Sequence, residues 1–280
     1  MKQRNITRLT GALGLTRKVV GVRFLYSWAD YEDSKGEDYS GKTTFCMMVK
    51  KASEGYHYKC CPENFGCDRS RMALGIDAKD MVTCSGEVFY ACNLYASRAI
   101  AKQAQEGTLF INQHLYGIEI APLENLSDAD VVIFLANAYQ MMRVVQGYAY
   151  QFGTMKNIGT VGNQGICSDL CARPFETNDI NISFLCEGAR RVCQWSCNDI
   201  GVGMPVNRFD AIVEGVIATL NLIEKTQNKE EILSRIDEET LDLSIDPEAY
   251  YGISYRHWLS QTKEKEQRYL NHLNELAKES

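Results

Sequence analysis

The sequence is 280 residues long, with a formal net charge of −6 at pH 7 and a sequence pI near 5.4. A chain of this length can bury a core without disulfide bonds, and its acidic balance argues against a general nucleic-acid or anionic-membrane surface. No apolar run approaches the roughly 18 residues that cross a bilayer, and no secretory signal follows Met1. We therefore expect a soluble, cytoplasmic protein without nucleic-acid or membrane partners.

The residue patterns predict helices and strands that alternate along much of the chain. In chain order the predictions are a helix over 4–15, a strand over 18–27, an acidic loop over 30–38, a helix over 43–53, a short strand over 56–58, a helix over 86–105, strands over 116–121 and 130–135, a helix over 137–151, a strand over 180–186, and helices over 208–224, 229–237 and 255–278. This order favours an α/β or α+β fold, with a mixed sheet and flanking helices. We expect a cysteine-rich domain over 1–225 and a helical C-terminal extension over 226–280.

Cysteine is the unusual component, because the chain contains 11. A reducing cytosol disfavours disulfides, so clustered thiols in such a protein indicate metal or redox chemistry. Cys84 and Cys92 lie in apolar helical surroundings and are expected to be packing residues. The remaining nine are candidate metal ligands: Cys46, Cys60, Cys61, Cys67, Cys167, Cys171, Cys186, Cys193 and Cys197.

Most of these candidates fall into two clusters. The first places Cys60, Cys61 and Cys67 within eight residues, and the second contains Cys167-x3-Cys171 followed by Cys186-x6-Cys193-x3-Cys197. A C-x3-C pair on a helix puts both sulfurs on one face. The run Asn163-Gln164-Gly165 ahead of the second cluster fits either a pocket lining or a turn.

Thiolates at such spacings suit an iron–sulfur cluster or zinc. Histidine is scarce, with four in the chain, which favours iron–sulfur, of 4Fe-4S type and in one or more copies, over zinc. An all-cysteine zinc site needs no histidine, so zinc stays open as an alternative. Arg69 and Arg190 lie close to the clusters in sequence, where they can balance thiolate charge or bind an anionic group.

A third motif points to different chemistry. The segment Gly36–Thr43 fits the phosphate-loop pattern G-x4-G-K-[ST], with Lys42 and Thr43 as its functional residues. A phosphate loop starts directly after a strand, whereas the predicted strand ends near Ser27, and Glu37 and Asp38 would repel phosphate. Nucleotide binding is therefore the weaker alternative.

Several stretches together resemble a known family. They are Leu13–Leu15 and Val20–Leu25, Phe45–Ala52, Cys67–Gly75, Ser183–Arg190 and Gly201–Pro205. In order and spacing they are similar to the uncharacterised cysteine-containing family called domain of unknown function 169, over about residues 10 to 225. The resemblance implies that Cys46, Cys67, Cys167 and Cys186 are the cysteines of the family, and that the other five candidates are additions in this chain.

The resulting hypothesis is an iron–sulfur protein of anaerobic metabolism that transfers electrons or reduces a small molecule, and so a candidate oxidoreductase. Its partner would be a small-molecule substrate or a redox protein, and a homo-oligomer is compatible with the sequence. The alternatives are a non-catalytic protein that binds zinc or another soft metal, and a nucleotide-dependent enzyme that uses the Gly36–Thr43 loop.

Overall fold

The computed structural model describes residues 2–236, 241–245, 247 and 263–279. The chain divides into two compact units, Met1–Ala218 and Thr219–Ser280. The boundary falls inside the stretch that the sequence assigned to the end of the first domain. Among the described residues, no helix is both long and apolar enough to cross a membrane.

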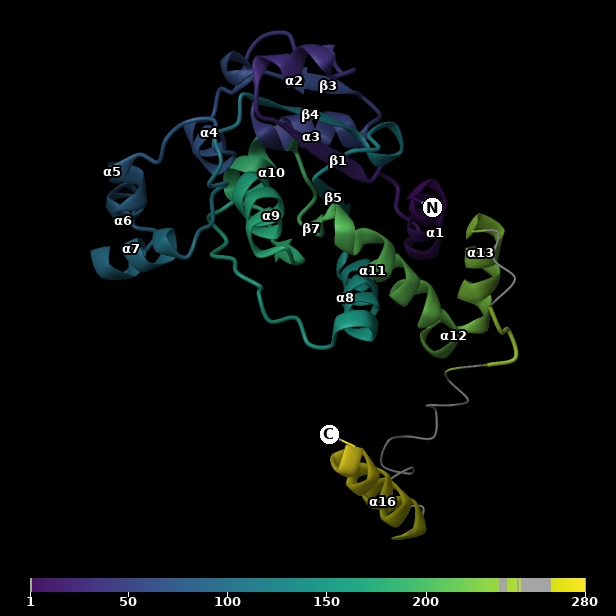
Figure 1. Ribbon diagram of the computed structural model, residues 1–280. Helices are drawn as coiled ribbons and strands as arrows, with labels where there is room; N and C mark the ends of the chain where they lie inside the picture. Colours follow the sequence, from purple (N-terminus) through teal and green to yellow (C-terminus); the bar gives the residue numbers. More distant parts are fainter. Residues whose placement is uncertain (1, 237–240, 246, 248–262, 280) are drawn as a thin grey trace. The chain divides into compact units, whose positions relative to one another are not determined.

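The described residues of the first unit contain a seven-stranded sheet in the order β2-β3-β4-β1-β5-β7-β6 (Figure 1). The strands are β1 (Val20–Leu25), β2 (Glu37–Asp38), β3 (Tyr58–Cys60), β4 (Gly117–Pro122), β5 (Val131–Ala136), β6 (Asn181–Ser183) and β7 (Ile200–Pro205). Neighbouring strands pair antiparallel, except that β2 and β3 pair in parallel. The sheet is therefore mixed, and the fold is α+β, as the sequence predicted.

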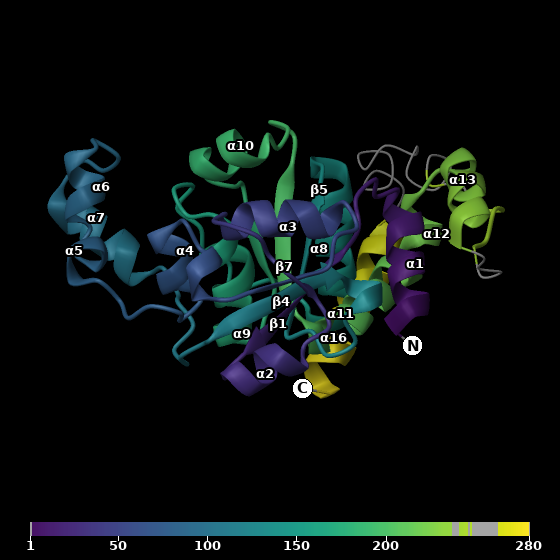
Figure 2. The ribbon, with the colours of Figure 1, turned by 90° about the horizontal axis from the view of Figure 1, so that it is seen from above.

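The first unit also contains helices. They are α1 (Lys2–Leu13), α2 (Trp28–Asp33), α3 (Phe45–Ser53), α4 (Asp68–Ala73), α5 (Met81–Cys84), α6 (Glu87–Ala91), α7 (Arg98–Glu106), α8 (Ala138–Phe152), α9 (Arg173–Thr177), α10 (Glu187–Cys193) and α11 (Val206–Ala218). Of these, α5, α6 and α7 contact one another, and most of the others flank the sheet (Figure 2). Short 3₁₀ turns cover Pro62–Asn64 and Leu123–Asn125, and a π-helix, η3, covers Ile166–Ala172. The π-helix is a rare element that often occurs at functional sites.

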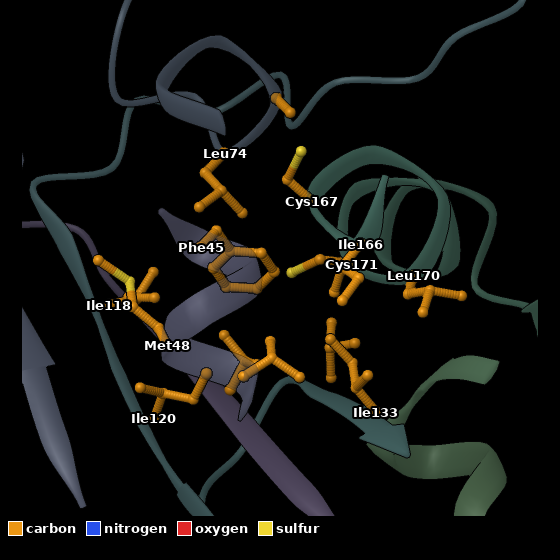
Figure 3. Close-up of a cluster of buried hydrophobic side chains, with 14 of the residues drawn as sticks. Phe45, Met48, Leu74, Ile118, Ile120, Ile133, Ile166, Cys167, Leu170 and Cys171 are labelled. Atoms are coloured by element: carbon orange, nitrogen blue, oxygen red, sulfur yellow. The ribbon is translucent and has the colours of Figure 1, made fainter. Parts of the chain in front are cut away.

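One face of the sheet carries the main core. Side chains alternate between faces along a strand, so Val131, Ile133 and Leu135 of β5 all point to the face covered by α3 and η3, where they join Phe45 and other apolar residues (Figure 3). Figure 2 shows α3 lying across the strands with α10 close by, and the two helices are in contact. This face brings α3, η3 and α10 together.

The opposite face is divided between apolar and polar halves. On the apolar half, α8 and α11 pack against β5 and β7. The two helices approach so closely that a Cβ on Gly215 would lie 2.1 Å from the carbonyl oxygen of Gly147. On the polar half, buried Glu119 accepts from Arg23 (3.2 Å) and bonds His57 Nε2 (2.8 Å). The charged network is thus kept away from the α3 and η3 side.

Three sequence predictions were wrong in detail. The acidic loop contains α2, because Ser27 caps a helix there and Asp30 completes a capping box. The helix predicted over 86–105 is two helices, α6 and α7, separated by Asn93, which has a φ of +56°. The strand predicted over 180–186 stops at Ser183, and Cys186 instead caps α10.

The strand β7 was not predicted, because Gly201 and Gly203 lower the strand propensity of its sequence. The glycines serve packing: a Cβ on Gly203 would lie 2.0 Å from the carbonyl oxygen of Leu170, and one on Gly201 would lie 2.3 Å from the Leu170 side chain. These glycines let η3 lie directly against the sheet.

Helices make up most of the described residues of the second unit, in agreement with the predicted helical extension. It contains α12 (Leu220–Ile223), α13 (Thr226–Ile236) and α16 (Lys263–Glu279). Lys229 is buried and donates to the carbonyls of Asp242 (2.9 Å) and Ile245 (2.6 Å). The predicted start of the last helix, residues 255–262, lies outside the described residues.

Candidate thiolate metal centre

Cysteines from four separate elements line one cavity of about 260 Å³ in the described part of the chain. They are Cys46, Cys67, Cys167 and Cys186. Three of these four stand at the start of an α-helix, and the fourth lies near the start of η3. The tertiary fold therefore gathers thiols that lie up to 140 positions apart in the sequence. We call this space the thiol cavity.

The helix starts position the thiols. Thr44 caps α3 by accepting from the amide of Met47 (3.2 Å), which sets Cys46 in the first turn. Cys186 caps α10 with its own sulfur, which accepts from the amide of Ala189 (3.3 Å). Leu185, just before it, has a φ of +65°, a conformation that costs a non-glycine residue about 1–3 kcal/mol. The fold thus tolerates strain where it presents a thiol.

Gly165 forms the floor between two of the sulfurs. A Cβ at this position would lie 2.9 Å from the sulfur of Cys186 and 3.8 Å from that of Cys46. Both sulfurs are therefore close to one point, and a side chain there would push against them. Asn163, Gln164 and Gly165 all line the cavity, so this run is a pocket lining rather than only a turn.

Burial makes three of the cavity thiols, those of Cys46, Cys167 and Cys186, weaker acids than an ordinary cysteine, because it raises the pKa of each. Burial and the neighbouring thiols raise the pKa of Cys46 well above its usual value, and burial raises the pKa of Cys167 to about 12. Burial also raises the pKa of Cys186, although backbone amides partly offset it. Metal ligation requires thiolates, so binding at this site must release protons.

Arg69 is the cation in the wall of the thiol cavity. Its Nη2 donates to Gln105 Oε1 (3.0 Å) and Gln164 Oε1 (2.7 Å), and its guanidinium lies 4.6 Å from the centre of the Phe89 ring. Its Nη1 is buried and, among the described residues, has no hydrogen-bond partner. The positive charge favours the thiolate of Cys167 and lowers the pKa of that thiol against the effect of burial.

The other candidate ligands lie elsewhere. Cys60, Cys171 and Cys193 are buried in the apolar core, Cys61 donates to Asn64 Oδ1 (3.2 Å), and Cys197 is exposed. Figure 3 shows the sulfur of Cys171 pointing toward the Phe45 ring, whereas that of Cys167 points away from it. The C-x3-C pair on η3 therefore does not converge on one centre, because one sulfur packs in the core and the other lines the cavity.

Two further predictions need correction. Arg190 does not line the thiol cavity, because its guanidinium donates to the carbonyls of Ser196, Phe184 (2.7 Å) and Asp199 (3.0 Å). These hydrogen bonds join the two ends of the segment that contains α10. Cys84 packs against the core as expected, but Cys92 is exposed. The prediction that Cys92 is a packing residue is wrong, because its helix ends there at the surface.

The Gly36–Thr43 segment does not form a cradle for phosphate. The amides of Gly36, Glu37, Tyr39 and Thr43 donate to acceptors elsewhere in the fold. A phosphate loop needs such amides free around the anion. Lys42 is exposed, and the segment contributes β2 to the edge of the sheet. Its match to the phosphate-loop pattern is therefore not accompanied by the backbone geometry of such a loop.

Part of the thiol cavity was not predicted from sequence. Phe89 and Val192 line it without any sequence signal that links them to cysteines. Among the described residues, no group of three or more His, Cys, Asp or Glu side chains is spaced to hold a metal ion. The thiols share a cavity but do not surround a single atom.

Comparisons with known proteins identify a family without an assigned function. Residues 8–215 match the profile of the family described as uncharacterised ArCR, domain of unknown function 169. An uncharacterised protein of Methanocaldococcus jannaschii is 21% identical over 133 residues, which cover 47% of this chain and 57% of that protein. The match thus spans just over half the length of this relative. No solved structure matches the chain.

Proposed function

The chain belongs to the family described as uncharacterised ArCR. Because that description names no function, we propose one from the geometry of the thiol cavity. The thiol cavity binds an iron–sulfur cluster, of 4Fe-4S type, through Cys46, Cys67, Cys167 and Cys186. The observation that supports this proposal is the convergence of these four thiols on one cavity. Four cysteine thiolates are the usual ligand set of such a cluster.

The donor set and its spacing favour a cluster over a single zinc ion. Among the described residues that line the cavity, no His, Asp or Glu side chain accompanies the four thiols. A zinc ion needs its ligands about 2.3 Å from one atom. A polynuclear cluster holds its thiolates around a larger body, which suits thiols that line a cavity of about 260 Å³.

When bound, the cluster would supply one-electron chemistry, so the protein transfers electrons to a redox partner protein or reduces a small molecule in anaerobic metabolism. Arg69 would reduce the negative charge of the ligated centre through its unpartnered Nη1. The free thiols require a reducing compartment, and we place the protein in the cytoplasm.

Anaerobic reconstitution with iron and sulfide tests this function. The wild-type protein should bind iron and sulfide in whole-cluster stoichiometry and give an EPR signal after reduction. Alanine variants at each of the four cavity cysteines should each lose most of the bound iron. Cys171→Ala is the matched control, because its sulfur lies on the same helix but packs in the core.

Two results would reject the proposal. One is a protein that stays colourless and iron-free after anaerobic reconstitution. The other is stoichiometric zinc without a redox signal, which would support the non-catalytic soft-metal alternative. Equal iron content in all the alanine variants would show that any bound iron lies outside the thiol cavity.

A further inference from the structure

A second cavity, of about 490 Å³, lies beside the thiol cavity. Its wall comes from α7, the loop at residues 159–161, η3 and α9, and it shares Gln164 with the thiol cavity. We call it the α7 cavity. Its size is in the range of small-molecule sites, roughly 300–1,000 Å³.

An acceptor is fixed in the wall of the α7 cavity. Asp169 is buried, and its Oδ2 accepts from Thr160 Oγ1 (3.1 Å) and Ser183 Oγ (2.9 Å). Among the described residues, no hydrogen bond is made to its Oδ1. The carboxyl group is therefore held in place with one oxygen left to accept from a ligand.

A guanidinium stands in the same wall. Arg173 donates from Nη2 to the carbonyl of Gly107 (2.6 Å) and from Nη1 to that of Asn157 (3.4 Å). A Cβ on Gly159 would lie 2.4 Å from its Cζ, so the glycine makes room for this side chain. A guanidinium has five N–H donors, and two carbonyls leave others for an anion.

These two groups act on each other through charge but are not a direct pair. The charge of Arg173 lowers the pKa of Asp169 against the effect of burial, whereas within the described part of the chain no ion pair joins the two side chains that line the α7 cavity. A ligand that satisfies both must carry an anion for the guanidinium and a donor for the carboxyl group. A small carboxylic acid with a hydroxyl or amino group has this chemistry.

Gln164 links the two cavities. Its Oε1 accepts from Arg69 (2.7 Å) and Ser168 (3.3 Å), and its Nε2 donates to Gln105 (3.3 Å). The side chain that separates the α7 cavity from the thiols is thus bonded to the guanidinium that faces them. A ligand in the α7 cavity would lie one side chain away from the thiol centre.

We propose that the α7 cavity binds a small hydroxy or amino carboxylic acid. The geometry of the α7 cavity alone supports binding of the acid. The further claim that the bound acid is a substrate rests on the proposed function. Arg173 binds the carboxylate, and Asp169 accepts from the hydroxyl or amino group. Gln164 positions the ligand beside the thiol centre.

Calorimetric titration of the full chain with L-lactate, L-malate, glycine and L-glutamate tests this site, with the neutral L-lactamide as a control. At least one acid should bind, and L-lactamide should not. Arg173→Gln should weaken the binding at least tenfold. Ala104→Phe fills the cavity from α7 without removing a charge, and it should abolish binding even if the arginine variant folds poorly.

The outcomes separate this site from the proposed function. Cys46→Ser should bind the same acid as tightly as the wild type, because it changes only the thiol cavity. The site is rejected if no acid binds with a Kd below about 10 mM, or if Ala104→Phe binds as well as the wild type. Acid binding without iron incorporation would reject the cluster and keep the α7 cavity, and the reverse result would do the opposite.

Discussion

The thiols that face the cavity and the thiols that fill the core lie in different surroundings. Cys167 and Cys171 lie one turn apart on η3 and both are buried, yet only Cys167 lines a cavity with Arg69 in its wall. Cys171 is enclosed by apolar side chains. Burial alone therefore does not identify a ligand, whereas convergence with other thiols and a nearby cation does.

Alanine variants at the two ends of α10 should give the largest difference between a cavity thiol and a core thiol. Cys186→Ala should remove most of the bound iron, because its sulfur faces the thiol cavity. Cys193→Ala should keep the iron and lower the free energy of unfolding by about 1–3 kcal/mol, because it leaves a small void in the core. Iron analysis and urea unfolding measure the two effects. Iron loss in both variants would contradict the distinction.

Alkylation of the thiols by iodoacetamide should separate exposed from cavity positions. Cys197 is exposed and should react first, and Cys167 should react at least about 100-fold more slowly, because its thiol is buried and has a pKa raised to about 12. Its rate should rise about tenfold per pH unit from neutral pH upward, since its thiolate fraction rises tenfold in that range. Peptide mass spectrometry measures each rate, and equal rates at neutral pH would refute the assignment.

A methyl group at the floor of the thiol cavity should weaken cluster binding. Gly165→Ala places a Cβ 2.9 Å from the sulfur of Cys186, which must rotate away, and we expect iron affinity to fall about tenfold. Gly188→Ala is the matched control, because its Cβ would lie 3.8 Å from the same sulfur, an ordinary contact. Competition with an iron chelator measures both. Equal affinities would show that the floor does not limit the site.

Asp169, on η3, gives a pH-dependent effect on stability. Burial raises its pKa to about 6 in the folded protein, above the unfolded value of about 3.9. The folded state therefore binds this proton more tightly, so the stability that it contributes is present below about pH 4 and is lost as the pH rises through 6. Relative to the wild type, Asp169→Asn should gain about 2 kcal/mol between pH 4 and pH 7.

Urea unfolding at the two pH values measures this difference. A constant difference between variant and wild type would show that Asp169 titrates as it does in the unfolded chain. Because Asn keeps an oxygen that accepts from Thr160 and Ser183, the variant serves as its own structural control.

The sequence predicted the parts of the fold that rest on local pattern. The strand β5 is apolar at every position, so its burial was evident, and the helix predicted over 137–151 is present as α8 (Ala138–Phe152). The strand β7 was missed because its glycines make room for Leu170, Gly203 for the backbone and Gly201 for the side chain, and no local pattern contains this contact. Tertiary packing there overrides strand propensity.

The candidate site, like the fold, was predicted from sequence only in part. Nearness in sequence pointed to Cys60, Cys61 and Cys67 as one cluster, but only Cys67 lines the thiol cavity. The family resemblance separated the four cavity cysteines from the other five, because it compares positions that one fold brings together. Phe89 and the α7 cavity depend on how α6 and α7 are placed, so residue spacing could not predict them.

Arg190 lies outside both cavities, but its three hydrogen bonds close the segment from Phe184 to Asp199 into a ring. That ring contains the strained backbone of Leu185 and the whole of α10. We expect a segment tied at both ends by one side chain to open as a unit rather than residue by residue. Loss of the Arg190 hydrogen bonds would then release Cys186 together with α10.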